Sequence, residues 1–371
     1  GYERPMWFAL DGEISSYEYS YNYQNWYPSA EYETSNTVKN VGLFDLSPFS
    51  KFEIKSDKAH QELQKICTAN IKKEIGKCTY THMLNTDGGI ETDLTVVCID
   101  DNHFRIISSA ATRERDKFHI RKHLADDIDL IDVTDDYCVF GLFGPKSREL
   151  MKTLSNNNFD NEEFKFGTAK YIQIDGINIW AQRLSYVGEL GYELYVKFNQ
   201  SKKIYELLIE KGKDFNLSNC GMHAMDIMRM ESGFLHWGHD ISPEENQYQA
   251  GLSFTISNNK KINFVGKKAL EKIKNDKIRS RFAMFTLKES KPGEPLLLHD
   301  EPIYFEDKII GRSTSGNYSF NFKKNLVFGY IKNDFSDEEL KSKNLYIEVE
   351  KKKYPILFQL EPLKRTDFKN S

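Results

Sequence analysis

The chain has 371 residues, of which 39% are hydrophobic and 13% aromatic, so it is long enough for two or three domains with substantial cores. Its formal net charge is only −4, and its acidic and basic residues are interspersed. This pattern argues against a dedicated nucleic-acid or membrane-surface protein. No apolar run approaches the roughly 20 residues of a membrane-spanning helix. We therefore expect a folded protein whose partners include neither nucleic acid nor a membrane.

The cysteines argue against a disulfide framework and against a zinc site. They are odd in number, widely spaced, and form no CxxC pair and no cluster with histidine. A reducing compartment, here the cytoplasm, is the simplest interpretation, and no metal is predicted. The five cysteines are Cys67, Cys78, Cys98, Cys138 and Cys220.

The first half of the chain mixes predicted helices and strands. Residues 1–30 are rich in Tyr and Trp without clear periodicity and are predicted to form an aromatic arm that packs onto a domain. Asp45 and Ser47, on physical grounds alone, are interpreted as turn residues. We expect helices at 29–40, 57–69, 112–124 and 146–154, and strands at 51–55, 80–84, 90–97, 103–109 and 137–143.

Asp93 is the unusual residue of the strand predicted at 90–97. Strands disfavour aspartate. Alternation places Asp93 and Thr95 on one face, opposite Leu94 and Val96. An edge or solvent-facing position would explain such a carboxylate without any function, and a functional role is the alternative.

The most informative stretch is Arg183 to Val196, which reads Arg-Leu-Ser-Tyr-Val-Gly-Glu-Leu-Gly-Tyr-Glu-Leu-Tyr-Val. Its two glycines predict a bend, and its second half alternates like a strand. Glu193 and Tyr195 would then share one face, opposite an apolar face. A half-buried strand would give the same alternation without a functional site.

In the second half of the chain, the predicted secondary structure changes near residue 279 from mixed helices and strands to short strands. Before that point we expect a hairpin at 172–179 and helices at 201–213 and 221–233, the methionines of the latter filling the core. His236 and His239 suggest a metal, but no carboxylate or cysteine lies at ligand spacing. After that point, short strands with regular turns predict a barrel or a small sheet, with Thr314 to Tyr318 as a turn and strands within 281–287, 304–312, 327–332 and 345–358.

Several of these motifs resemble the aminomethyltransferase family, which includes the glycine-cleavage T-protein. The resemblance rests on Tyr-Val-Gly-Glu-x-Gly-Tyr-Glu-Leu, on Gly-Leu-Phe-Asp-x-Ser at 42–47, on Gly-Gly-Ile-x-x-Asp-Leu at 88–94 and on Trp-Gly-His-Asp-Ile at 237–241. The first and last motifs look most like the folate-binding half of dimethylglycine and sarcosine dehydrogenases. The resemblance implies an α+β fold of three subdomains in a cloverleaf around a central folate channel, with a C-terminal β-barrel.

The same resemblance implies a domain plan. Residues 1–30 would be an arm or linker from a missing upstream module, since the chain begins with Gly1 and shows no signal peptide. Residues 31–275 would be the folate-binding region of two subdomains, and 279–366 the barrel. No Gly-x-Gly-x-x-Gly occurs, so FAD is expected only on the upstream module.

The resemblance assigns roles to single residues of this chain that match functional positions of the family. Asp93 matches the aspartate needed for one-carbon transfer, and Glu193 matches the glutamate that binds the pterin ring. Tyr186, Thr95 and Leu84 match positions expected to contact tetrahydrofolate. For Glu189, within the same signature, a structural role and a ligand role stay open.

One departure concerns the helix predicted at 221–233. Glycine-cleavage proteins carry an arginine where this chain has Met225, so contacts made through that arginine are not assumed here.

The resemblance also implies a reaction. It is the capture of an iminium or methylene unit from dimethylglycine or sarcosine as 5,10-methylenetetrahydrofolate, with an FAD-dependent oxidase module as partner in cis or in trans. A stand-alone folate-dependent demethylase of another methylated compound and a non-catalytic folate-binding protein are the alternatives.

Overall fold

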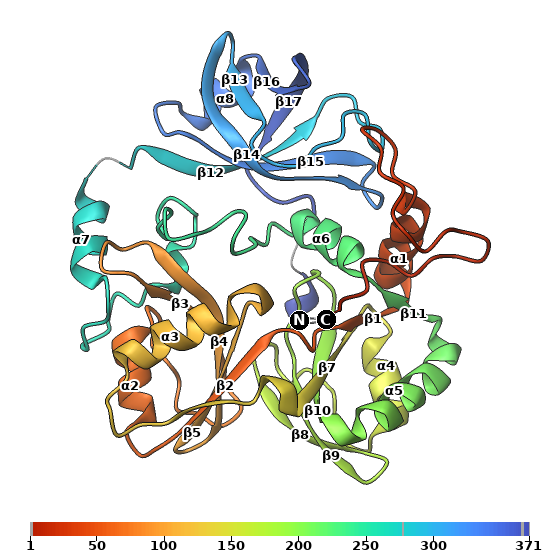
Figure 1. Cartoon of the computed structure of the whole chain (residues 1–371), viewed down its shortest axis with the longest axis vertical. Coiled ribbons are helices and arrows are strands. Elements are labelled where there is room, and N and C mark those ends of the chain that lie inside the picture. The colour runs from red at the N-terminus through yellow and green to blue at the C-terminus, as the bar shows by residue number, and fades with distance from the viewer. Residues whose placement is uncertain (1–2, 277, 365–366, 371) are drawn as a thin grey trace.

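A computed structural model of the chain shows three lobes around a common centre (Figure 1). The structure describes residues 3–276, 278–364 and 367–370. One lobe contains a five-stranded sheet, the second a six-stranded sheet and the third a closed barrel. This arrangement confirms the predicted α+β fold with three subdomains and a C-terminal barrel.

The five-stranded sheet is antiparallel throughout and has the strand order β3-β4-β5-β2-β6. Leu94 and Val96 of β4 share a core with Leu63 of α2 and Ile120 of α3. Because side chains alternate along a strand, the other face of β4 is turned away from this core. The elements are β2 (Ser50–Lys55), α2 (Ala59–Ile66), β3 (Cys78–Leu84), β4 (Ile90–Asp100), β5 (His103–Ser108), α3 (Arg113–His123) and β6 (Leu130–Asp132).

The six-stranded sheet has the order β11-β1-β7-β10-β9-β8, with only the β1–β11 pair parallel. Leu150 of α4 and Ile204 of α5 form a core with Tyr192 and Leu194 of β10. The helices therefore cover one face of the sheet and leave the other toward the centre (Figure 1). The elements are β1 (Val41–Asp45), β7 (Tyr137–Phe143), α4 (Ser147–Leu154), β8 (Ala169–Ile174), β9 (Ile177–Gln182), β10 (Gly191–Lys197), α5 (Phe198–Gly212) and β11 (Leu217–Cys220).

The barrel closes through pairing of its first and last strands, in the order β12-β15-β14-β13-β16-β17. Its interior is filled by apolar side chains such as Phe285, Val327 and Ile347, so it is a packed core rather than an open channel. The elements are β12 (Ser280–Leu287), β13 (Pro302–Phe305), β14 (Lys308–Ser319), β15 (Lys324–Lys332), α8 (Asp337–Ser342), β16 (Leu345–Val349) and β17 (Lys352–Gln359).

The turn predicted at Thr314 to Tyr318 is wrong, because these residues lie inside β14. The hydroxyls of Thr314 and Ser315 donate to Oδ1 of Asp240 at 2.6 and 2.8 Å. The strand register shifts between Ser313 and Ser315. Small polar residues here satisfy a buried carboxylate instead of reversing the chain, and composition alone does not separate these two uses.

The centre between the lobes is occupied by α6 (Met222–Glu231) and by the loops that follow it (Figure 1). The N-terminal arm reaches this helix, since Met222 N donates to Pro5 O at 3.0 Å. The C-terminal segment reaches its other end through a bond of 2.8 Å from Lys364 N to Glu231 O. The remaining α-helices of the described residues are α1 (Tyr27–Lys39) and α7 (Lys267–Asn275), and five short 3-10 turns complete the helical elements.

The turn interpretation of Asp45 and Ser47 is confirmed. Asp45 ends β1, and its Oδ1 accepts a hydrogen bond of 2.9 Å from Ser47 N. Among the described residues no helix is long and apolar enough to cross a membrane.

Candidate functional site

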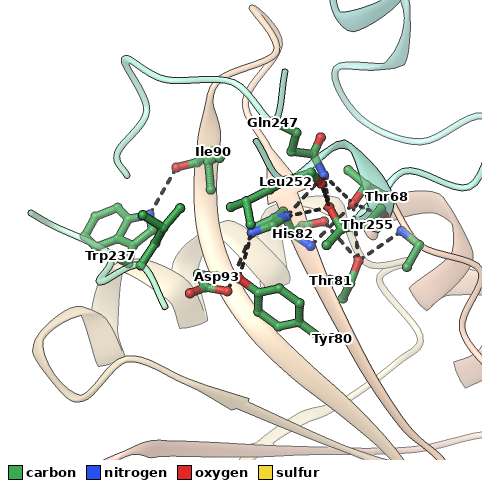
Figure 2. Close-up of polar contacts among 12 residues, drawn as sticks. Thr68, Tyr80, Thr81, His82, Ile90, Asp93, Trp237, Gln247, Leu252 and Thr255 are labelled. Atoms are coloured by element: carbon green, nitrogen blue, oxygen red, sulfur yellow. Dashed lines mark hydrogen bonds and ion pairs between the residues drawn. The ribbon is translucent and has the colours of Figure 1, made fainter. Parts of the chain in front are cut away.

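Asp93 lies in the middle of β4, an interior strand between β3 and β5. The alternative of an edge or solvent-facing position is therefore wrong, and its side chain is only 19% exposed. Oδ1 is fully buried and accepts no hydrogen bond from any described residue. His82 is its cross-strand neighbour on β3, with Nε2 3.6 Å from Oδ1 (Figure 2).

The environment of Asp93 favours its protonated form. Burial raises the pKa of the Asp93 carboxyl to about 7, the nearby hydroxyl of Tyr80 opposes this rise, and the carboxylate of Asp116 adds to it. A carboxyl with this pKa exchanges its proton near neutral pH. That is the property which general acid–base catalysis needs.

Glu193 lies on β10, another interior strand, between β7 and β9. Tyr192 and Leu194 point into the core beneath α4 and α5, so Glu193 and Tyr195 share the opposite face, as the alternation predicts. The Tyr195 hydroxyl donates to Oε2 of Glu193 at 3.0 Å. Burial raises the pKa of Glu193 to about 7, and this hydrogen bond works against the rise.

The loop before β10 is docked onto the end of α6. Gly188 has a φ of 71°, and a Cβ at this position would lie 2.0 Å from Oγ of Ser232. Only glycine fits both this backbone conformation and this close approach. The Tyr186 hydroxyl donates to Leu235 O at 2.9 Å, and its ring lies 6.1 Å from that of Phe234 at an interplanar angle of 17°. The predicted bend, at Gly188, therefore folds the signature against the end of the central helix.

One cavity of about 1360 Å³ brings these groups together at the centre of the three lobes. Asp93 enters it from the five-stranded sheet, Glu193 from the six-stranded sheet, and Met284 from the barrel. Its volume exceeds the roughly 300–1,000 Å³ of ordinary small-molecule sites. Two largely buried carboxyl groups from different sheets thus face one ligand-sized space.

Comparisons with known proteins agree with this architecture. Residues 1–260 match the family model described as "GCVT N-terminal domain", and residues 281–363 match "Glycine cleavage T-protein C-terminal barrel domain". The aminomethyltransferase of Halothermothrix orenii is 31% identical over 81% of this chain and 83% of that protein. The chain belongs to the glycine cleavage T-protein family of aminomethyltransferases.

Other relatives of this aminomethyltransferase-family chain are longer proteins. Mitochondrial dimethylglycine dehydrogenase of Rattus norvegicus is 31% identical over 99% of the chain, which spans 42% of that protein. The 4-methylaminobutanoate oxidase (formaldehyde-forming) of Paenarthrobacter nicotinovorans is 35% identical over 86% of the chain and 38% of its own length. Among solved structures, aminomethyltransferase T from Bartonella henselae has a TM-score of 0.80, with 20% identity and 94% coverage of both chains. This last match supports the fold.

The cavity brings together four of the predicted site residues, and the other two lie elsewhere. Leu84, the last residue of β3, is fully buried in a separate core cluster beside Ile90 and Leu270. The Glu189 carboxylate pairs with the Lys364 ammonium, and neither residue is among the described residues that line the cavity. The four that line it are Asp93, Thr95, Tyr186 and Glu193.

Sequence reasoning missed two residues of β3, Tyr80 and His82. Tyr80 lines the cavity opposite Thr95, and its hydroxyl lies 3.3 Å from Nε2 of His82. The available signal was the Tyr-x-His alternation just before the Asp87-Gly88 turn. This signal did not show which residue of β3 pairs with Asp93. A register shift between Met83 and Leu84 decides that pairing, and the position of the turn alone does not reveal the shift.

Sequence reasoning also missed a buried charge network on α6. Met225 lines the cavity where the family resemblance places an arginine. One turn later, Arg229 donates to Asp226 at 2.8 Å and to Asp240 at 2.5 Å. The guanidinium is therefore already compensated by two carboxylates, and the Asp-x-x-Arg spacing was the sequence signal for part of this network.

His236 and His239 also line the cavity, with ring centroids 4.7 Å apart. Burial lowers the pKa of His236 to about 4, and the nearby Arg229 adds to this effect, so the ring is neutral at physiological pH. In the part of the chain that the structure describes, no three His, Cys, Asp or Glu side chains form a group that could hold a metal ion.

Proposed function

We propose that this chain carries out tetrahydrofolate-dependent one-carbon transfer, with Asp93 as the proton-transferring residue and Glu193 as the ligand of the pterin ring. The observation that carries the proposal is the pair of largely buried carboxyl groups, from two different sheets, that face one cavity. Burial raises the pKa of both groups to about 7. Membership of the aminomethyltransferase family supports the proposal, since the resemblance of the motifs implies folate binding in that family.

Glu193 suits the pterin ring because of its hydrogen-bonding pattern. A pterin edge presents two parallel donors, N3–H and the 2-amino group, and a carboxylate presents two parallel acceptors. The Tyr195 hydroxyl donates only to Oε2 of Glu193 and holds the carboxylate in place. Tyr186 and Phe234 provide aromatic surface on the same cavity wall.

Asp93 suits the reacting end because it can hold or release a proton near neutral pH. Bound tetrahydrofolate would supply the amine nitrogens that receive the one-carbon unit. The Asp93 carboxylate stabilises a positive charge that develops beside it and takes up the proton that a reacting amine releases. The buried, low-dielectric position of the carboxyl strengthens both effects.

The carbon donor that we propose is a methylated amine such as dimethylglycine or sarcosine, oxidised on an FAD-dependent module in the same polypeptide or on a separate one. The support is that the relatives named for dimethylglycine and 4-methylaminobutanoate are N-methylamine enzymes at least twice as long as the matched region. The second candidate is a stand-alone aminomethyltransferase. It is favoured by the 83% coverage of the Halothermothrix orenii protein.

Calorimetric titration of 5-formyltetrahydrofolate, a stable folate mimic, into the wild-type chain and into Glu193→Ala tests the folate site. Loss of a buried bidentate carboxylate contact costs about 2–4 kcal/mol, so affinity should fall at least tenfold. Glu206→Ala is the matched control, because Glu206 is an exposed residue of α5. Equal affinities of Glu193→Ala and wild type would remove Glu193 from the site, and no binding by the wild type would contradict the proposal.

The carbon donor is tested by mixing the chain with an FAD-dependent N-methylamine oxidase module, tetrahydrofolate and either dimethylglycine or sarcosine. We expect 5,10-methylenetetrahydrofolate to form and free formaldehyde to fall in proportion. Unchanged formaldehyde release with both amines would contradict this donor class and favour the stand-alone alternative.

A further inference from the structure

His82 is a buried histidine that the proposed mechanism does not yet use. It is fully buried on β3, and its Nε2 faces Oδ1 of Asp93 at 3.6 Å and the hydroxyl of Tyr80 at 3.3 Å (Figure 2). Its Nδ1 points the other way, to Oγ1 of Thr255 and Nε2 of Gln247, both at 3.1 Å. The ring thus connects the Asp93 carboxyl to a polar network behind the cavity wall.

The hydrogen bonds behind the ring select one tautomer of His82. The Thr255 hydroxyl donates its only hydrogen to Leu252 O at 2.7 Å, so its oxygen can only accept from other groups. The Gln247 amide has two hydrogens, and its two shortest contacts are to Thr255 Oγ1 at 2.8 Å and Thr68 Oγ1 at 2.9 Å. Both amide hydrogens are thereby used, and the hydrogen on Nδ1 of His82 donates to Thr255.

The ring is also neutral. Burial lowers the pKa of His82 to about 3, so it carries a single N–H hydrogen at physiological pH. Because that hydrogen is on Nδ1, Nε2 presents a lone pair to the Asp93 side of the ring. An acceptor at this position favours a neighbouring carboxyl group that keeps its proton.

We propose that His82 is a positioning residue for Asp93, whose carboxyl proton lies on Oδ1 as a hydrogen-bond donor to Nε2, leaving Oδ2 directed at the cavity. The burial of Oδ1 supports this orientation, because the 19% exposure of the side chain must come from its other atoms. The distance of 3.6 Å is longer than a hydrogen bond, and such contacts often tighten only when the ligand binds. In this resting arrangement the proton is on Asp93 and His82 is neutral, and Asp93 acts as a base only after it has released that proton.

The inference rests on the proposed role of Asp93. Three other titratable groups lie near the Asp93 carboxyl. The Tyr80 hydroxyl on β3 can donate either to Nε2 or to the Asp93 carboxyl, Asp116 on α3 is the second carboxylate, and Tyr186 contributes a phenol from the loop before β10. None of these groups changes when the far side of the His82 ring is altered. The His82 network can therefore be tested separately from them.

The first test reads the tautomer directly. Nitrogen-15 spectra of the full chain labelled at histidine distinguish a protonated from an unprotonated ring nitrogen, and His82→Asn identifies the His82 signals by their absence. We expect a protonated Nδ1 and an unprotonated Nε2 in the wild type. The opposite assignment, or a doubly protonated ring, would overturn the proposal. The measurement contains no folate, so it is independent of whether the proposed function holds.

The second test uses two matched variants. His82→Gln places an amide oxygen near the position of Nε2, whereas His82→Asn keeps a polar group only near Nδ1. Carbon-13 titration of aspartate carboxyls, with Asp93 assigned through Asp93→Asn, should show the Asp93 pKa falling by about one unit in His82→Asn and staying near the wild-type value in His82→Gln. A value in His82→Asn that is unchanged or raised would contradict the proposal.

A third variant covers the case in which His82 substitutions do not fold. Thr255→Val keeps the shape of Thr255 but removes the acceptor of the Nδ1 hydrogen, so the Asp93 pKa should fall here too. The lower limb of the kcat pH profile should move with this pKa while the affinity for 5-formyltetrahydrofolate is retained. A uniform loss of activity without movement of the pH profile would identify a merely structural role and overturn the proposal.

Discussion

Asp93 and Glu193 are two largely buried carboxyl groups on the cavity wall whose closest polar contacts differ. Glu193 accepts a hydrogen bond of 3.0 Å from the Tyr195 hydroxyl. The Oδ1 of Asp93 is fully buried, accepts no hydrogen bond from a described residue and faces His82, while the nearby Tyr80 hydroxyl lowers the pKa of the Asp93 carboxyl. Burial nevertheless raises the pKa of both groups to about 7. Burial thus determines how readily each carboxyl loses its proton, whereas the neighbour determines whether the group is better suited to accept hydrogen bonds or to carry a proton.

The two carboxyls reach the cavity by the same construction. Each sits on an interior strand whose opposite face packs into a core, Leu94 beside Asp93 and Leu194 beside Glu193. The packed face prevents either strand from turning its carboxyl toward bulk water, since a shift of one residue would bury the polar face. The apolar packing behind each strand therefore offsets the free-energy cost of keeping the two carboxyl groups away from bulk water.

The largest effect is expected for Asp93→Asn, which keeps the shape of the side chain and removes its ability to exchange a proton. One-carbon transfer should fall by about 10²–10⁴-fold, the usual contribution of general acid–base catalysis. The affinity for 5-formyltetrahydrofolate in calorimetry should be retained, in contrast to Glu193→Ala. If Asp93→Asn lost binding while keeping its turnover rate, the assignment of the two roles would be reversed.

A smaller effect is expected on stability, and it depends on pH. Both carboxyls have folded-state pKa values near 7, above their ordinary values of 3.8 for Asp93 and 4.5 for Glu193. Between about pH 4 and 7 the folded state therefore holds protons that the unfolded state has released, so stability falls as the pH rises through this window. Above about pH 7 both groups are ionised in the folded state, and the full free-energy cost of burying the two charges is present.

Neutral replacements should remove this penalty. Asp93→Asn and Glu193→Gln should each exceed the wild type in free energy of unfolding by roughly 1–3 kcal/mol at pH 8, and the differences should vanish near pH 4. Urea unfolding at the two pH values measures both, and a gain that is equal at pH 4 and pH 8 would rule out the titration as its cause.

The smallest effect is expected for Glu189→Gln. Glu189 pairs with Lys364 and is not among the described residues that line the cavity. Loss of this partly buried ion pair should lower the free energy of unfolding by about 1 kcal/mol and leave the affinity for 5-formyltetrahydrofolate unchanged. An affinity loss as large as that of Glu193→Ala would instead show that Glu189 contacts the bound folate as directly as Glu193 does.

Local patterns of the sequence were sufficient for several parts of the molecule. The alternation on β4 and β10 correctly separated the Asp93 and Glu193 faces from the core faces. The glycines of the signature correctly predicted the bend at Gly188. Patterns failed where one residue type serves two purposes, as at Thr314 and Ser315, whose hydroxyls satisfy Asp240 within a strand.

The sequence by itself determined most of the longer helices and strands, the face on which each carboxyl lies and the family to which the motifs point, because periodicity and turn chemistry act over a few residues. Only the tertiary structure decided that Asp93 and Glu193 share one cavity, that Leu84 and Glu189 lie outside its lining, and that His82 stands behind Asp93. Gln247 and His82 are 165 residues apart in the chain. Burial, and therefore the pKa of each carboxyl, arises from such distant contacts, which no local pattern encodes.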